Sequence, residues 1–148
     1  MTVIVKNGVF SNASHSQFGP YVEFDAERGA PANAQNLDVQ PDTDPSNLLK
    51  HLEHVESIRI AFPSSADGRG NSIARALRDH GYKGHLRAVG HVLADQYPLA
   101  IRSGFDDIEI DEKLAARQPE DQWRDALGRV STTYQSRVMR PLSQDAAA

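Results

Sequence analysis

The residues with the clearest potential for chemistry lie in one polar loop, between an apolar strand predicted over residues 57–62 and a helix. The loop and the helix start contain Asp67, Gly68, Arg69, Gly70 and Ser72. In a parallel α/β sheet, such a loop lies at the carboxyl ends of the strands, where the helix offers unpaired amides and the positive end of its dipole. We therefore predict an anion-binding site at this loop.

A second arginine comes from the next strand, which is predicted over residues 85–89. Arg87 belongs to this neighbouring unit, so its guanidinium group is expected to reach the same anion as Arg69. The alternative is structural: Asp67 and Gly68 form a turn, Asn71 caps the helix and Arg69 pairs with Asp67. The spacing of the residues is compatible with both interpretations.

Other kinds of site are less well supported. Gly68 and Gly70 do not make a dinucleotide fingerprint, because about five residues precede the first glycine and no acidic residue ends the second strand. His51 and His54 lack a third metal ligand of suitable spacing, so we predict no metal site. The serines of the loop have no nucleophile elbow around them, and no catalytic residue is predicted.

Composition narrows the functional classes further. The chain has 148 residues, 39% of them hydrophobic, and a formal net charge of -4, with its lysines and arginines scattered. A nucleic-acid partner is not expected, because a phosphate-backbone binder needs a basic stripe. There is no cysteine, so we expect no cofactor held by thiolates, and another component must carry the electrons of any redox reaction.

No apolar run approaches the length of a membrane span, and the first residues lack the pattern of a secretory signal. These features predict a cytoplasmic protein with no membrane partner. Because the chain has neither a dinucleotide fingerprint nor a cysteine, we also expect no cofactor.

Strands and helices alternate along the chain, which predicts β-helix-β units and a parallel sheet. The predicted strands at 57–62, 85–89 and 107–110 each alternate apolar with polar residues. This pattern favours an α/β fold with a parallel sheet of three to four strands and helices mainly on one face, like part of a TIM barrel. Arg59, Arg87 and Glu109 are then expected on one surface, close enough to neutralise one another.

The predicted domain organisation has three parts. Residues 1–36 form a small N-terminal β-hairpin around Asn7-Gly8 and a loop, 37–140 form the α/β domain, and 141–148 form a disordered tail. A sheet that does not close into a barrel leaves strand edges, so we expect a homo-oligomer or a partner protein to cover them.

An ordered string of motifs resembles one bacterial family, the domain of unknown function numbered 934, over about residues 37 to 135. The motifs are Asp67-Gly-Arg-Gly-x-Ser-x-Ala-Arg75, Gly81-Tyr-Lys-Gly84, Leu86-Arg-Ala-Val-Gly90, Val92-Leu-x-Asp-Gln96 and Gly104-Phe-Asp106. The match includes Asp67, Arg69, Arg87, Asp95 and Gln96, which adds Asp95 and Gln96 to the candidate ligand-binding residues. His91 and Asn71 depart from the family pattern, in which an acidic and an aromatic residue are usual.

Members of that family are often encoded beside assimilatory sulfite reductase and are described as oxidoreductases of sulfite reduction. The resemblance therefore implies an accessory or anion-binding protein of sulfite reduction, with sulfite reductase as a candidate partner. Two alternatives stay open. One is a stand-alone barrel-like enzyme that acts on a small carboxylate or phosphate compound with Asp67 or Asp111 as acid or base. The other is a non-catalytic homodimer or partner-binding module.

Overall fold

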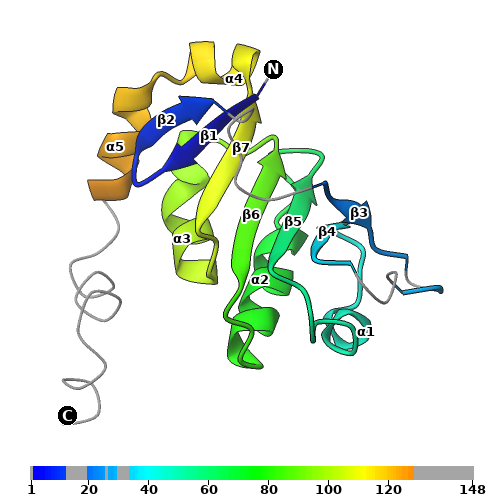
Figure 1. Cartoon of the computed structure of the whole chain (residues 1–148). Helices are drawn as coiled ribbons and strands as arrows, with labels where there is room; N and C mark the ends of the chain where they lie inside the picture. The colour runs from blue at the N-terminus through cyan, green and yellow to red at the C-terminus, as the bar shows by residue number, and fades with distance from the viewer. Residues whose placement is uncertain (1, 13–19, 26, 30–33, 129–148) are drawn as a thin grey trace, which may run out of the picture.

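The fold is a mixed β-sheet with helices packed on one of its faces (Figure 1). The structure, a computed structural model, describes residues 2–12, 20–25, 27–29 and 34–128. The seven strands are β1 (Thr2–Lys6), β2 (Val9–Asn12), β3 (Val22–Glu23), β4 (Asn36–Val39), β5 (Ser57–Phe62), β6 (His85–Gly90) and β7 (Asp107–Asp111). Their order in the sheet is β2-β1-β7-β6-β5-β4-β3. Strands β3 to β7 run parallel, and β1 pairs antiparallel with both β2 and β7.

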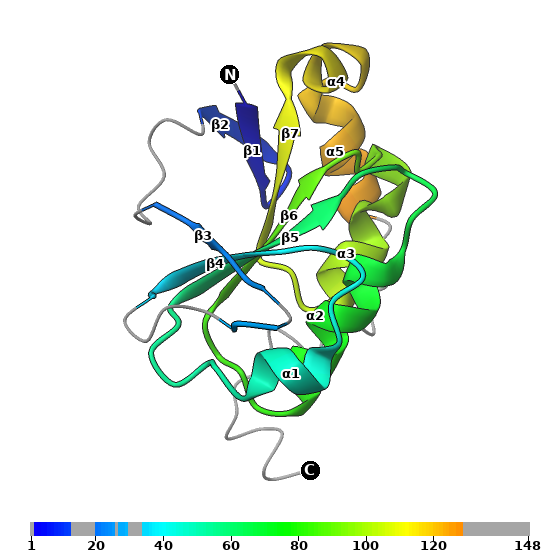
Figure 2. The same cartoon turned by 90° about the vertical axis from the view of Figure 1, so that its right-hand side faces the viewer.

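Short helices connect the parallel strands β4 to β7, and two more follow β7. They are α1 (Pro45–Leu49), α2 (Arg69–Asp79), the 3-10 turn η2 (Ala94–Gln96), α3 (Tyr97–Ser103), α4 (Glu112–Arg117) and α5 (Glu120–Gly128). Figure 2 shows α1, α2, α3 and α5 together on one side of the sheet. No helix among the described residues is long and apolar enough to cross a bilayer. We call the opposite side of the sheet, which these helices leave uncovered, the open face.

The hydrophobic core lies between the helices and the sheet face that they cover. Alternate residues of a strand point to opposite faces, so Ile58, Ile60 and Phe62 of β5 all point into this core. The largest helical contributions are Tyr97 and Trp123, whose rings meet edge to face at 5.4 Å. Full burial of such side chains contributes about 1.5–3 kcal/mol each relative to exposure, which anchors the helix layer to the sheet.

The expected sheet of three to four parallel strands, arranged like part of a TIM barrel, is wrong. The sheet has seven strands, is mixed, and stays open, with β2 and β3 as its outer strands. Asn7 and Gly8 do turn the chain at positive φ, as the predicted hairpin requires, but β1 also pairs with β7 and extends the sheet. Strand β4 was not predicted, because asparagine and aspartate are poor strand formers.

Local sequence signals explain two helix boundaries. Asp44 caps α1 by accepting a hydrogen bond from Ser46 N, and Pro45 opens the helix. Pro98 splits its helical segment into η2 and α3, and lies in the first turn of α3. The domain boundaries at 1–36 and 37–140 stay predictions, and the predicted tail at 141–148 lies outside the described residues.

Gly90 is the last residue of β6 and pairs with Phe62, the last residue of β5, at a point where the two backbones approach closely. Its φ is 123°, and a Cβ added there would overlap the carbonyl oxygen of Phe62. The next residue, His91, donates its backbone N–H to the same oxygen at 2.8 Å. Any side chain at position 90 would therefore strain the backbone and push the two strand ends apart.

We predict that Gly90→Ala lowers the free energy of unfolding by about 2 kcal/mol or more, because it combines a positive φ with a steric overlap. Urea denaturation should show a lower midpoint at an unchanged m-value. Gly68→Ala is the matched control, since its φ is -92° and a Cβ there meets no atom within 4 Å. Equal stabilities for the two variants would contradict the proposed close approach.

Candidate functional site

Charged side chains form a row across five strands of the open face. The strand register places Glu23 beside Asp38, Asp38 beside Arg59, Arg59 beside Arg87, and Arg87 beside Asp107. The strand neighbours of the other four residues point into the core, and Glu23 lines one hollow with Asp38 and Arg59, so these five side chains point away from the helices. We call these five residues the charged row. It holds two arginines directly opposite each other, an arrangement that is unfavourable unless carboxylates compensate it.

Arg59 is held by the carboxylate to one side of it. Its Nε and Nη2 donate to the two oxygens of Asp38 at 2.6 and 2.7 Å, and Tyr21 lies under its guanidinium group at 4.1 Å. The hydrogen bonds with Asp38 raise the pKa of Arg59 despite its partial burial. The side chains of Arg59 and Asp38 are still 26% and 32% exposed, so this pair can be reached from solvent.

Arg87 is bound by Asp107, the carboxylate on the side away from Arg59, and this pair is buried. Its Nε and Nη2 donate to Asp107 at 2.7 and 3.0 Å, and the two side chains are only 5% and 3% exposed. Burial opposes ionisation of Asp107, but hydrogen bonds from His85 and Arg87 outweigh it and lower its pKa. Glu109 Oε1 lies 3.6 Å from Nη1 of Arg59 and also 3.6 Å from Nη1 of Arg87. The prediction that these three side chains share one surface is confirmed.

A chain of hydrogen bonds at the amino ends of the strands was missed in the sequence. Ser57, His85 and Asp107 are the first residues of β5, β6 and β7. Ser57 Oγ lies 3.3 Å from His85 Nδ1, and His85 Nε2 lies 2.9 Å from Asp107 Oδ2. The signal that could have revealed the chain is that a serine, a histidine and an aspartate open consecutive parallel strands.

This chain of hydrogen bonds holds Tyr21 in place, and the serine in it is not accessible as a nucleophile. Ser57 is fully buried, and the Tyr21 hydroxyl lies 2.7 Å from its Oγ. Burial raises the pKa of Tyr21, although the hydrogen bond to Ser57 and the nearby arginines act in the opposite direction. Tyr21 thus stays neutral and connects the polar strand ends to the ring contact with Arg59.

The predicted anion loop is occupied by its own carboxylate. Asp67 Oδ1 accepts from the backbone N–H and Nε of Arg69 at 3.1 and 3.0 Å, and Oδ2 accepts from Nη2 at 2.8 Å. These bonds lower the pKa of Asp67. An external anion at the start of α2 would have to compete with this carboxylate. The Arg69 side chain is nevertheless 60% exposed, which leaves room for a second partner.

The structure gathers most of the other predicted residues around this loop. Gly70 packs against Phe62, and Gln96 donates from Nε2 to the Ser65 carbonyl at 2.5 Å, which connects the loop to η2. Gly68 and Ser72 are exposed beside Arg69, and Asp95 is exposed on η2.

Arg87 does not join this group. Arg69 opens α2 on the helical side of the sheet (Figure 2), whereas Arg87 is bound to Asp107 on the open face. The structure does not bring the two guanidinium groups to a common anion. Binding at the loop itself stays a prediction.

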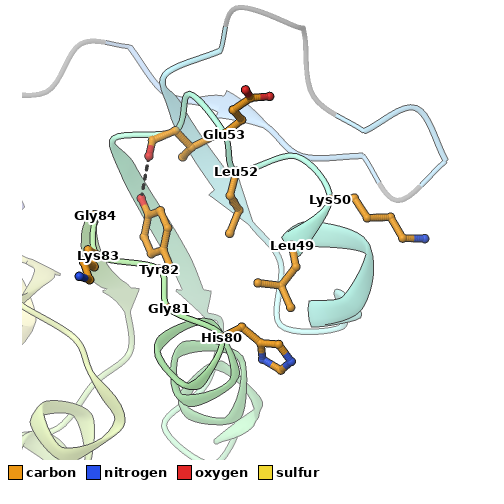
Figure 3. Close-up of a pocket in the computed structure, with 10 residues that line it drawn as sticks. Leu49, Lys50, Leu52, Glu53, His80, Gly81, Tyr82, Lys83 and Gly84 are labelled. Carbon is orange, nitrogen blue, oxygen red and sulfur yellow. Dashed lines mark hydrogen bonds between the residues drawn. The ribbon is translucent and has the colours of Figure 1, made fainter.

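The surface of the described residues includes the following hollows. One of about 260 Å³ lies on the open face and includes Glu23, Asp38, Gln40, Arg59, Ala61 and Val89 in its lining. A second, of about 500 Å³, lies between the end of α1 and the end of α2, where Leu49, Leu52 and Tyr82 line it (Figure 3). The third, of about 670 Å³, lies between η2 and α5. The described residues hold no group of three side chains placed to bind a metal ion.

Comparison with known proteins places the chain in a family. The model of the family described as bacterial protein of unknown function (DUF934) matches residues 36–144, and the chain belongs to this family. No curated protein and no solved structure matches the chain.

The Arg87–Asp107 pair predicts a pH-dependent contribution to stability. Asp107→Asn should lower the free energy of unfolding by about 3–5 kcal/mol at pH 7, because it removes the carboxylate that is doubly hydrogen-bonded to the buried Arg87. The pKa of Asp107 is lowered in the folded state, so its contribution is complete above the unfolded value of about 3.9 and is lost as pH falls below it. The gap between wild type and variant, measured by urea unfolding, should therefore narrow below about pH 4.

Asp79→Asn, on the exposed surface of α2, is the control for this experiment and should stay close to wild type throughout. A gap for Asp107→Asn that is constant down to pH 3 would contradict the proposed ionisation of Asp107.

The Asp67–Arg69 contacts predict how the loop responds to anions. Asp67→Asn should strengthen sulfate binding by about fivefold, because it removes the competing charge at the helix start. Arg69→Ala should weaken binding, while Arg102→Ala on α3 should leave it unchanged. Backbone-amide shifts of Gly70 and Ser72, followed by NMR at constant ionic strength, measure the affinity. If sulfate shifts these amides equally in all four proteins, the loop is not a specific anion site.

Proposed function

We propose that the protein is an accessory protein of assimilatory sulfite reduction that acts by binding a partner protein through its open face. The observation that carries the proposal is the charged row, which the helices leave uncovered. Asp38 and Arg59 are partly exposed, and Glu23 is exposed beside them. A fixed pattern of opposite charges on an uncovered surface supports recognition by electrostatic complementarity.

The link to sulfite reduction rests on the family resemblance and on the composition. The chain contains no cysteine, so a thiolate-bound redox centre has to come from another protein. Sulfite reductase is the partner that the resemblance suggests, and a shared cytoplasmic location follows from that assignment. In this proposal the protein contributes binding, and its partner contributes the electron transfer.

The ionisation of the charged row favours recognition over acid–base chemistry. Hydrogen bonds raise the pKa of Arg59 and lower the pKa of Asp107, so each residue keeps its charge near neutral pH. A general acid or base works best with a pKa near the working pH.

The enzyme alternative invoked Asp67 or Asp111, and both have structural contacts. Asp67 is bonded to Arg69, and Asp111 accepts from Leu114 N at 2.7 Å as the cap of α4. These contacts support the proposal of a binding protein.

Glu23→Lys tests the open face without removing an ion pair, because Glu23 makes no salt bridge with another described residue. In a strain that lacks the gene, wild-type protein should restore growth on sulfate as the sole sulfur source. Glu23→Lys should restore it poorly, because it reverses one charge of the row. Glu53→Lys is the matched control and should restore growth fully, because Glu53 is an exposed carboxylate that lines the separate hollow between the ends of α1 and α2.

Unchanged growth of the deletion strain on sulfate would overturn the link to sulfite reduction. Full restoration by Glu23→Lys would overturn the role of the open face. Light scattering of the purified proteins separates one further case: a fall in the mass of Glu23→Lys alone would show that the face binds a second copy of this chain.

A further inference from the structure

The geometry points to a second property of the open face: its hollow of about 260 Å³ is a binding site for an alkylammonium group. This inference goes beyond the partner proposal, because a free amine would use the same groups as a lysine side chain of a partner. The site lies at the carboxyl ends of β4, β5 and β6, since Gln40 follows β4 while Ala61 and Val89 are the last residues but one of their strands. Ligands of parallel α/β sheets bind at that end of the strands.

The charge of the hollow selects a cation. Arg59 and Asp38 neutralise each other through two hydrogen bonds, which leaves the carboxylate of Glu23 as the net charge of the lining. Glu109 lies 3.6 Å from Nη1 of Arg59 and adds further negative charge behind it. An anion that approached Arg59 would meet these carboxylates, whereas a single positive charge would balance Glu23.

The other residues that line the hollow fit the aliphatic stem and the hydrogen-bond donors of an alkylammonium ion. Ala61 and Val89 are paired neighbours on β5 and β6, and they give the hollow an apolar floor between polar walls. An aliphatic stem can cover this floor while its ammonium group donates hydrogen bonds to Glu23, to Asp38 and to the amide oxygen of Gln40. A primary alkylamine in its protonated form has such an apolar stem and a compact head group with three hydrogen-bond donors.

The probes are cadaverine, a free diamine, and Nα-acetyl-lysinamide, which represents a lysine side chain in a protein. Pentanoate has a similar stem with the opposite charge. In an NMR titration of the full chain, both amines should shift the backbone amides of Gln40, Ala61 and Val89 saturably, and pentanoate should not. Stronger binding of Nα-acetyl-lysinamide would identify a partner's lysine as the source, and stronger binding of cadaverine would identify a free amine.

Glu23→Gln keeps the shape of the side chain and should weaken amine binding by about fivefold, as expected for one exposed charge contact. Glu53→Gln, which lines the separate hollow between the ends of α1 and α2, should leave it unchanged. The inference is overturned if pentanoate binds these amides as well as the amines do, if Glu23→Gln binds amines like wild type, or if no probe shifts them. Failure of the growth test with normal amine binding would remove the partner proposal alone.

Discussion

The structure depends on the placement of two arginines directly opposite each other on neighbouring parallel strands. Arg59 and Arg87 would repel each other across β5 and β6, so each needs a carboxylate at its other side. Asp38 on β4 and Asp107 on β7 supply these charges, and Glu109 lies between the two guanidinium groups. The order of the four central parallel strands is therefore also the order that balances the charges of the open face.

These five residues, Asp38, Arg59, Arg87, Asp107 and Glu109, form an ion-pair network that also contacts the N-terminal hairpin. Thr2 at the start of β1 donates from its hydroxyl to Glu109 Oε2 at 3.1 Å, beside the antiparallel pairing of β1 with β7. Tyr21, before β3, reaches the network from the other side through Ser57 and Arg59. The buried half of the network around Asp107 supports the fold, whereas its exposed half around Asp38 and Glu23 is available to a partner. The two proposals for this face, a partner surface and an amine site, both use that exposed half.

The sequence predicted features that depend on neighbouring residues in the chain. Alternation along β5, β6 and β7 was enough to place Arg59, Arg87 and Glu109 on one surface, and Asn7-Gly8 correctly marked the turn between β1 and β2. Features that depend on distant pairing were not predictable in this way. Strand β4 contains only two apolar residues and is stabilised by its neighbours, since Asp38 pairs with Arg59 of β5. Arg69 opens the helix after β5 and Arg87 lies in β6, but periodicity alone did not show that Arg87 is bound to Asp107 on the open face, away from the helix start.

Site-specific photo-crosslinking in the native cell can distinguish whether the open face or the helical side contacts the proposed partner. A photoreactive amino acid at position 40 lies on the open face beside the hollow, and one at position 75 lies on the exposed surface of α2. The probe at position 40 is expected to form adducts that contain peptides of sulfite reductase, and the probe at position 75 is not. Adducts with sulfite reductase from position 75 alone would contradict this expectation, as would no adduct of that enzyme from either position.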